Sequence, residues 1–128
     1  MKKILRFLFF AWIISLVSCS PKENENFVLE ASDFQTKLSQ TPEGYLLDVR
    51  TSEEIATGII AGAVNIIYDE NFAQKISEVP LQPIFIYCAS GKRSAKAAKI
   101  LREKGYAPVY ELEGGLNAWK EKGLKLNQ

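Results

Sequence analysis

Two short apolar runs constrain the fold of this 128-residue chain most strongly. Residues 45–49 (Tyr-Leu-Leu-Asp-Val) and 83–87 (Pro-Ile-Phe-Ile-Tyr) are nearly continuous in apolar side chains, which is typical of strands buried on both faces. Helical patterns separate the strand candidates, and a chain of this length allows one domain. The alternation predicts an α/β fold, with a doubly wound parallel sheet of about five strands and helices on both faces.

The remaining elements follow from apolar spacing and turn residues. Further strands are expected at residues 27–29, 63–66 and 109–112. Helices are expected at about 32–39, 52–56, 70–79, 91–104 and 116–122. Ser32 or Asp33 is expected to cap the first helix and Ser52 the second. In the longest helix, the side chains expected to face the sheet are those of Ala95, Ala98, Ile100 and Leu101.

The first eighteen residues have the pattern of a signal peptide. Lys2, Lys3 and Arg6 give a positive start, and residues 7–17 carry no charge. This run is too short for a membrane-spanning helix, which needs roughly 20 residues, but it has the length of a signal-peptide core. Leu-Val-Ser-Cys at 16–19 resembles the bacterial lipobox, in which the cysteine becomes lipidated. An ordinary signal with an incidental cysteine is the alternative.

These features predict a lipoprotein signal peptide at 1–18, a lipidated tether at 19–26 anchored through Cys19, and a domain at 27–126. The expected location is the bacterial cell envelope, with the outer membrane facing the periplasm favoured over the inner membrane and the cell surface. Ser20 gives no retention signal of the Asp type. If Cys19 carries lipid, Cys88 is the only thiol of the mature chain, and such a thiol is either buried and inert or reactive.

Composition excludes several kinds of site. The sequence has no histidine, which removes histidine-ligated metals and catalytic pairs of Ser or Cys with His. Two cysteines are too few for a four-thiolate metal site. A net charge of +1 lacks the basic excess typical of nucleic-acid binders. We therefore expect no metal, no cofactor and no nucleic acid, and chemistry that depends on a carboxylate, a hydroxyl or one thiol.

The loop after the second apolar run carries this thiol. Its residues are Cys88, Ala89, Ser90, Gly91, Lys92, Arg93 and Ser94. In a parallel sheet it lies at the carboxyl end of a strand, where ligands bind. Backbone N–H groups of a loop that enters a helix form an anion-binding nest, and the helix N-terminus adds positive charge. Gly91 permits the necessary backbone angles, Ser94 can cap the helix or bond the sulfur, and residues 92 and 93 add two cations. We expect this loop to keep the thiol ionised, because the thiolate is the nucleophile.

The pattern Cys-x-x-Gly-x-Arg-Ser resembles the active-site loop of single-domain rhodaneses, which are sulfurtransferases. Three further stretches are similar to that family in the same order: Leu-Leu-Asp-Val-Arg at 46–50, Gly-Ile-Ile-Ala-Gly-Ala-Val-Asn-Ile at 58–66 and Glu-Gly-Gly-Leu-Asn-Ala-Trp at 113–119. The resemblance covers about residues 27–124 and implies a single rhodanese-like domain. Ile59 and Ala61 depart from it, since the family usually has His and Pro there.

The resemblance also implies a reaction and its partners. Cys88 would attack the outer sulfur of thiosulfate or a similar sulfane donor and become a persulfide, and a thiol, cyanide or a protein acceptor would then remove that sulfur. Residues 89–94 would bind the substrate, and Lys92 with Arg93 would favour a doubly charged donor. Asp48 and Arg50 would either orient this loop or form a structural ion pair. The chain is expected to be a monomer.

Other readings of the same loop remain open. A cysteine phosphatase has five residues between its cysteine and arginine, whereas four residues separate Cys88 from Arg93, so the pocket is expected to be too small for phosphate. The domain is alternatively a membrane-anchored persulfide relay or a non-catalytic binding module. A lone cysteine after an apolar strand is usually a core residue. A thiol sealed in the core, or protonated well above neutral pH, would contradict the sulfurtransferase interpretation.

Overall fold

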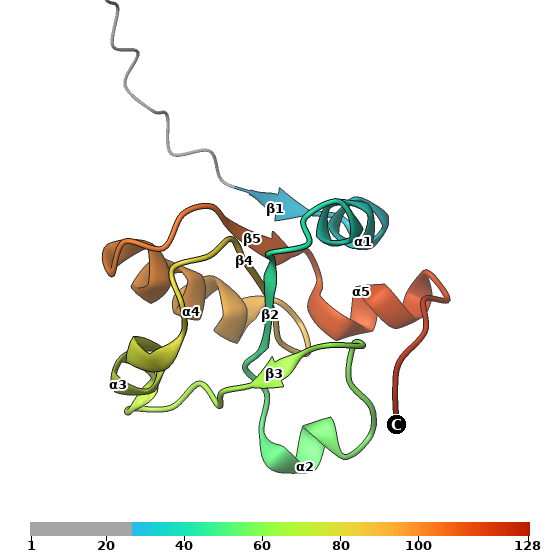
Figure 1. Ribbon diagram of the computed structural model, residues 1–128. Helices are drawn as coiled ribbons and strands as arrows, with labels where there is room; N and C mark the ends of the chain where they lie inside the picture. The colour runs from blue at the N-terminus through green and yellow to red at the C-terminus, as the bar shows by residue number, and fades with distance from the viewer. Residues whose placement is uncertain (1–26) are drawn as a thin grey trace, which may run out of the picture.

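A computed structural model describes residues 27–128, which form a five-stranded parallel sheet with helices on both faces (Figure 1). The strand order is β1-β5-β4-β2-β3. The strands are β1 (Val28–Leu29), β2 (Tyr45–Asp48), β3 (Val64–Asn65), β4 (Ile84–Tyr87) and β5 (Val109–Leu112). All four neighbouring pairs are parallel, so the predicted fold class is confirmed.

The helices divide between the two faces of the sheet. They are α1 (Ala31–Ser39), α2 (Ser52–Ile55), α3 (Phe72–Lys75) with the short 3-10 helix η1 (Ile76–Glu78), α4 (Lys92–Glu103) and α5 (Gly115–Glu121). Buried side chains of α3, η1 and α4 pack on one face, and those of α1 and α5 pack on the other. The sheet is therefore covered on both sides, which accounts for the apolar runs in its central strands.

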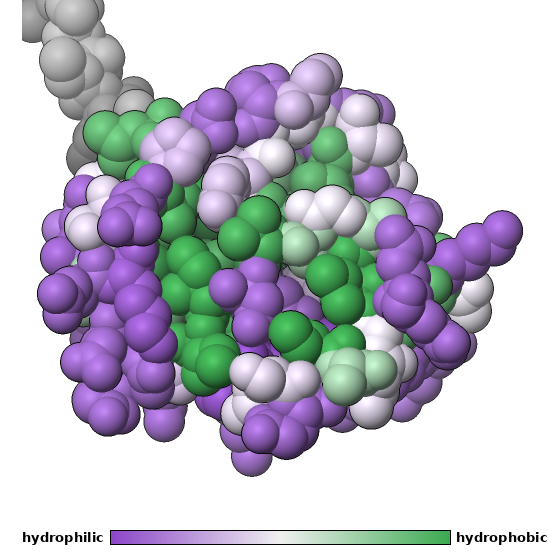
Figure 2. Space-filling view, turned by 60° about the horizontal axis from the view of Figure 1, so that its bottom comes forward, coloured by the Kyte–Doolittle hydropathy of each residue, from purple (hydrophilic) through white to green (hydrophobic). Residues whose placement is uncertain are grey.

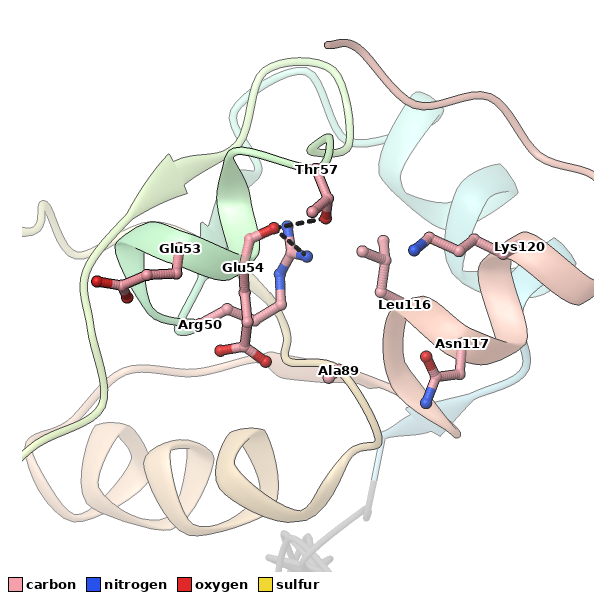
Figure 3. A pocket seen from close by; sticks show the side chains of 8 residues that line it. All are labelled: Arg50, Glu53, Glu54, Thr57, Ala89, Leu116, Asn117 and Lys120. Atoms are coloured by element: carbon pink, nitrogen blue, oxygen red, sulfur yellow. Dashed lines mark hydrogen bonds between the residues drawn. The ribbon is translucent and has the colours of Figure 1, made fainter.

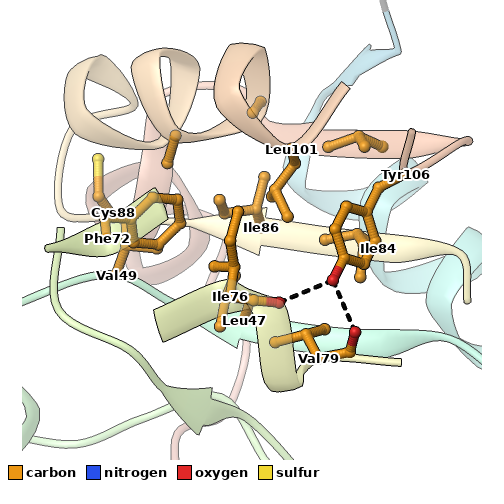
Figure 4. Close-up of a cluster of buried hydrophobic side chains, with 13 residues drawn as sticks. Leu47, Val49, Phe72, Ile76, Val79, Ile84, Ile86, Cys88, Leu101 and Tyr106 are labelled. Atoms are coloured by element: carbon orange, nitrogen blue, oxygen red, sulfur yellow. Dashed lines mark hydrogen bonds between the residues drawn. The ribbon is translucent and has the colours of Figure 1, made fainter. Parts of the chain in front are cut away.

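The central strand β4 supplies side chains to both cores. Ile84 and Ile86 join the cluster with α3 and α4, and Cys88 continues this alternation beyond the end of the strand (Figure 4). Phe85 and Tyr87 join the cluster with α1 and α5. All five residues are fully buried. The alternation decides on which side of the sheet the thiol lies.

Both predicted helix caps are wrong. The first helix begins at Ala31 with Glu30 at its N-cap, and within the described residues no side chain caps it. The second helix is capped by Thr51, whose hydroxyl accepts a hydrogen bond from the Glu54 amide while the Glu54 carboxylate accepts one from the Thr51 amide. This capping box selects Thr51 over Ser52 because it needs a Glu three residues after the cap.

Two expected helices differ in detail. In α4, Ala98 and Leu101 are buried and Ile100 packs against the same cluster, as predicted, whereas Ala95 is exposed and Ala97 is buried in its place. The helix expected at 70–79 is only four residues of α3 followed by η1. Pro80 holds the preceding Val79 in an extended conformation, which prevents the helix from continuing.

The expected signal peptide (1–18), the lipidation of Cys19 and the tether (19–26) lie outside the described residues. Between residues 27 and 128, no helix has the length and apolarity to cross a bilayer. Backbone pairing in this part extends almost to the end of the chain, because Asn127 exchanges two hydrogen bonds of 2.8 Å with Ile59.

Candidate active site

Cys88 follows directly after β4, at the carboxyl edge of the sheet where ligands bind in such folds. The loop then turns back over the sulfur. Gly91, the N-cap of α4, has a φ of +94°, which is the left-handed conformation that glycine adopts most easily. The Gly91 amide donates a hydrogen bond of 3.1 Å to Cys88 Sγ. One backbone amide of the expected nest is thus aimed at the sulfur.

Opposing effects act on the pKa of the Cys88 thiol. Burial disfavours the thiolate, but hydrogen bonds from the Ser94 hydroxyl and from the amides of Ser94, Ser90 and Gly91 favour it. The hydrogen bonds dominate, and the pKa of the Cys88 thiol is lowered. The Ser94 hydroxyl lies between two acceptors, the Cys88 sulfur and the Gly91 carbonyl oxygen, and it donates to the carbonyl at 3.2 Å. Ser94 therefore interacts with the sulfur and the loop rather than capping α4.

The burial of Cys88 bears on the choice between an inert and a reactive thiol. The residue is 0% exposed and belongs to the apolar cluster beside α3 and α4. Burial alone agrees with an inert core cysteine. However, an apolar site without hydrogen-bond donors raises the pKa of a thiol. The donors around the Cys88 sulfur lower its pKa instead. The structure therefore gives the expected lowering of the thiol pKa but buries the residue, so the case for a reactive thiol depends on the hydrogen-bond donors and not on exposure.

The N-terminus of α5 supports the loop from the other side. The Leu116 amide donates to the carbonyl oxygen of Cys88 at 2.8 Å, and the Asn117 amide donates to that of Ala89 at 3.0 Å. Gly115, with a φ of +61°, allows this close approach. This support of the loop by α5 was not predicted from the sequence, although the two adjacent glycines at 114–115 are a signal for a tight backbone contact.

Arg93 differs from the free cation that the sequence analysis expected. Its guanidinium donates two hydrogen bonds to the Glu54 carboxylate, of 2.8 and 2.7 Å, and both side chains are about one-third exposed. Hydrogen bonding from Arg93 lowers the pKa of Glu54 to about 2. Lys92 is exposed. One of the two expected cations, Arg93, is therefore neutralised by the Glu54 carboxylate of α2.

Asp48 and Arg50 form a buried ion pair of 2.8 Å. The Arg50 guanidinium also donates to the carbonyl oxygens of Gly58 (2.7 Å) and Glu54 (3.3 Å). These hydrogen-bond partners lie between residues 48 and 58, so the pair fastens the end of β2 to α2 and to the segment after it. The guanidinium also lies 5.7 Å from the ring centroid of Tyr87, the last residue of β4. The geometry favours the structural ion pair over direct orientation of residues 88–94.

A pocket of about 330 Å³ lies between α2 and α5 (Figure 3). Its lining consists of Arg50, Glu53, Glu54, Thr57, Ala89, Leu116, Asn117 and Lys120. Ala89 brings the pocket next to the loop, although Cys88 lies outside the lining. Lys120 reaches into the pocket from α5, while the Glu54 carboxylate turns toward α4. The space-filling view of this side of the molecule shows apolar surface around a small group of hydrophilic side chains (Figure 2).

No set of three or more His, Cys, Asp or Glu side chains within residues 27–128 is placed to hold a metal ion. The chemical groups that the site offers are therefore a thiol of lowered pKa, backbone amides aimed at its sulfur, and a small adjoining pocket. Together they suit nucleophilic attack by sulfur with stabilisation of an anionic product.

Comparison with known proteins gives a consistent result. The family described as rhodanese-like domain matches residues 30–122. A sulfurtransferase of Allochromatium vinosum is 34% identical over 99 residues, which are 77% of this chain and 92% of the relative. Thiosulfate sulfurtransferase GlpE of Shewanella oneidensis is 33% identical over 86 residues, 66% of this chain and 84% of the relative. The crystal structure of a rhodanese-related protein from Thermoplasma volcanium superimposes with a TM-score of 0.70 at 28% identity, covering 78% of this chain and 96% of that one.

Proposed function

Because the chain belongs to the rhodanese-like domain family, we propose that it is a sulfurtransferase whose nucleophile is Cys88. The observation that carries the proposal is the set of donors around its sulfur, which lower the thiol pKa although the residue is buried. This arrangement supplies a thiolate without a histidine base, in a sequence that has no histidine.

In the first half-reaction, the Cys88 thiolate attacks the outer sulfur of thiosulfate or of a similar sulfane donor. A new sulfur–sulfur bond forms at Cys88, the sulfur–sulfur bond of thiosulfate breaks, and its electron pair leaves with sulfite. The product is a Cys88 persulfide anion. The amides that favour the thiolate are placed to stabilise this anion as well, because they form an anion-binding nest.

In the second half-reaction, an acceptor takes the outer sulfur and the electron pair of the persulfide bond returns to Cys88 as thiolate. With cyanide the product is thiocyanate, and with a thiol it is a new persulfide. A protein acceptor would make the chain a persulfide relay, which is the alternative function. Covalent catalysis in two steps of this kind gives ping-pong kinetics.

We further propose that the domain acts at a bacterial envelope membrane, on the periplasmic side of the outer membrane. The support is the sequence alone: a signal-peptide core at 7–17 and the lipobox-like segment that ends at Cys19. The test is the mass of the N-terminal peptide of the mature protein, isolated from membranes of cells that express the full chain or Cys19→Ala. The expected result is a chain that begins at Cys19 and carries acyl groups, and Cys19→Ala is expected to lose both the acyl mass and the cleavage at this position. An unmodified Cys19 in the full chain would contradict lipidation.

The test of the proposed sulfurtransferase activity compares the intact mass of the protein lacking residues 1–19 before and after incubation with thiosulfate. The expected result is a gain of one sulfur atom that cyanide reverses and that Cys88→Ser abolishes. An unchanged mass with Cys88 demonstrably reduced would overturn the proposal in favour of a non-catalytic module. Steady release of sulfite with a small acceptor would indicate an enzyme, whereas a single stoichiometric burst would indicate a relay.

A further inference from the structure

The two arginines near the loop both carry a carboxylate partner. Arg50 is paired with Asp48 at 2.8 Å and is almost fully buried. Arg93 is paired with Glu54 through two hydrogen bonds, which is the strongest geometry for a guanidinium and a carboxylate. A doubly charged sulfur donor therefore meets no unpaired guanidinium at either position.

Glu54 is fixed independently of its arginine. Its carboxylate accepts a hydrogen bond of 2.9 Å from the Thr51 amide in the capping box of α2. The other side of the box, from the Glu54 amide to the Thr51 hydroxyl, measures 3.3 Å. The carboxylate is thus held in place by α2 and holds Arg93 on the first turn of α4, 39 residues further along the chain.

Arg93 lies on the first turn of α4, the helix whose N-cap Gly91 donates to the Cys88 sulfur. Hydrogen bonding to Glu54 is the main cause that raises the pKa of Arg93, and the negative charge of Cys88 adds to it. The Arg93–Glu54 pair is one-third exposed, whereas Cys88 is 0% exposed, so the pair lies nearer to solvent than the thiol. An incoming anion has to compete with Glu54 for this guanidinium.

We propose that Glu54 is a specificity-determining residue that withholds Arg93 from anionic substrates and so makes the site discriminate against doubly charged sulfur donors. The inference rests on the proposed function for the role of Cys88 as nucleophile. It assigns the natural donor to a class of lower charge, such as an organic persulfide, which needs no free guanidinium. The composition of the loop alone suggested the opposite preference.

The experiment compares two alkylating reagents at Cys88 of the full chain. Iodoacetate is an anion and iodoacetamide is neutral, and both lose iodide to the same thiolate. The ratio of their rate constants cancels changes in thiol pKa and in accessibility. The rates are measured by mass spectrometry on the peptide that carries Cys88, so that Cys19 does not interfere.

In Glu54→Gln the iodoacetate-to-iodoacetamide ratio is expected to rise about five- to tenfold, because a freed cation on the first turn of α4 attracts the anionic reagent and has no such effect on the neutral one. Gln retains an oxygen for the Thr51 amide, so the capping box survives. The matched control is Glu53→Gln, which removes the same charge from the neighbouring residue of α2 and measures the general electrostatic effect. Its ratio is expected to rise less than about twofold, as for a screened surface charge.

The decisive comparison is made in variants that also carry Arg93→Gln. In these variants, Glu54→Gln is expected to raise the iodoacetate-to-iodoacetamide ratio no more than Glu53→Gln does, because no guanidinium remains to be released. Equal ratios in Glu54→Gln and Glu53→Gln, or a rise that persists without Arg93, would overturn the inference. If Glu54→Gln does not fold, Glu54→Asp replaces it, since the shorter side chain breaks the paired geometry. Its expected ratio lies above that of the wild type, and an equal or lower ratio would overturn the inference.

Kinetics with thiosulfate as the sulfur donor relate the alkylation test to the proposed reaction. The KM for thiosulfate is expected to fall several-fold in Glu54→Gln, and this fall is expected to disappear when the same change is made in Arg93→Gln. If the wild-type chain takes no sulfur from any sulfane donor, the proposed function fails, while the alkylation ratios still decide the role of Glu54. The two failures are therefore distinguishable.

Discussion

A Cβ atom on Gly115 would lie 2.5 Å from the carbonyl oxygen of Cys88. That oxygen accepts the Leu116 amide at 2.8 Å, so the first turn of α5 is joined directly to the peptide that carries the nucleophile. The contact requires a residue without a side chain at position 115. A change in α5 is therefore expected to reach the sulfur through the backbone.

Gly115→Ala is expected to destabilise the fold strongly. The left-handed φ of +61° alone costs about 1–2 kcal/mol for an L-residue, and the methyl group would also overlap the backbone of Cys88 and Ala89. The control is Gly123→Ala, at a φ of +71° with open space around its Cβ within the described chain. Denaturant unfolding is expected to show a loss at least about 2 kcal/mol larger for Gly115→Ala, which is typical of overpacking. Equal losses would show that the backbone contact is unimportant.

The fold was predictable because its strongest signals are local. The apolar runs at 45–49 and 83–87 could only be strands covered on both sides, and that fixed the layers. The burial of Ala97 rather than Ala95 in α4 was not predictable in the same way. Alanine and lysine alternate closely in that helix, so the phase is set by the fit against the sheet rather than by the sequence pattern.

The site was predictable in part for a related reason. Cys88, Gly91 and Ser94 lie within one loop, so their spacing could be interpreted without knowledge of the tertiary structure. The Glu54–Arg93 pair joins residues 39 positions apart, and only the placement of α2 beside α4 brings them together. From the sequence, Arg93 could therefore only be expected as a free cation, because the carboxylate that neutralises it is distant along the chain.

Ser94→Ala is expected to raise the pKa of the Cys88 thiol. The Ser94 hydroxyl is the first of the hydrogen-bond donors that lower this pKa against the effect of burial. The measurement is the rate of iodoacetamide alkylation at Cys88 as a function of pH, whose midpoint is expected to move upward so that the rate at neutral pH falls. The control Ser90→Ala keeps the amide through which Ser90 acts. An equal shift in both variants would contradict the role of the hydroxyl.

The ion pair of Glu54 is expected to make stability depend on pH in the acidic range. Folding lowers the pKa of Glu54 from 4.5 to about 2, mainly through hydrogen bonding from Arg93. Its contribution is therefore complete above pH 4.5 and lost as the pH falls toward 2. Because the pair is one-third exposed, the advantage of the wild type over Glu54→Gln is expected to be about 1 kcal/mol at neutral pH. Chemical unfolding at several pH values measures it. An advantage that survives to pH 2, or is as large in the Arg93→Gln background, would exclude the ion pair as its source.

The buried pair of Asp48 and Arg50 gives a test that separates a structural role from a catalytic one. Arg50→Gln leaves the fully buried Asp48 carboxylate without its charged partner, and breaking a buried pair in this way costs about 3–5 kcal/mol. The control is Lys75→Gln, because Lys75 and Asp69 are 39% and 31% exposed in their pair and such a pair is worth at most about 1 kcal/mol. Arg50 donates no hydrogen bond to residues 88–94 within the described chain, and its one contact with β4 is with the ring of Tyr87. We therefore expect the folded fraction of Arg50→Gln, kept at low temperature, to retain the alkylation rate of Cys88. A stable variant whose thiol has lost its reactivity would instead place Arg50 in the machinery of the loop.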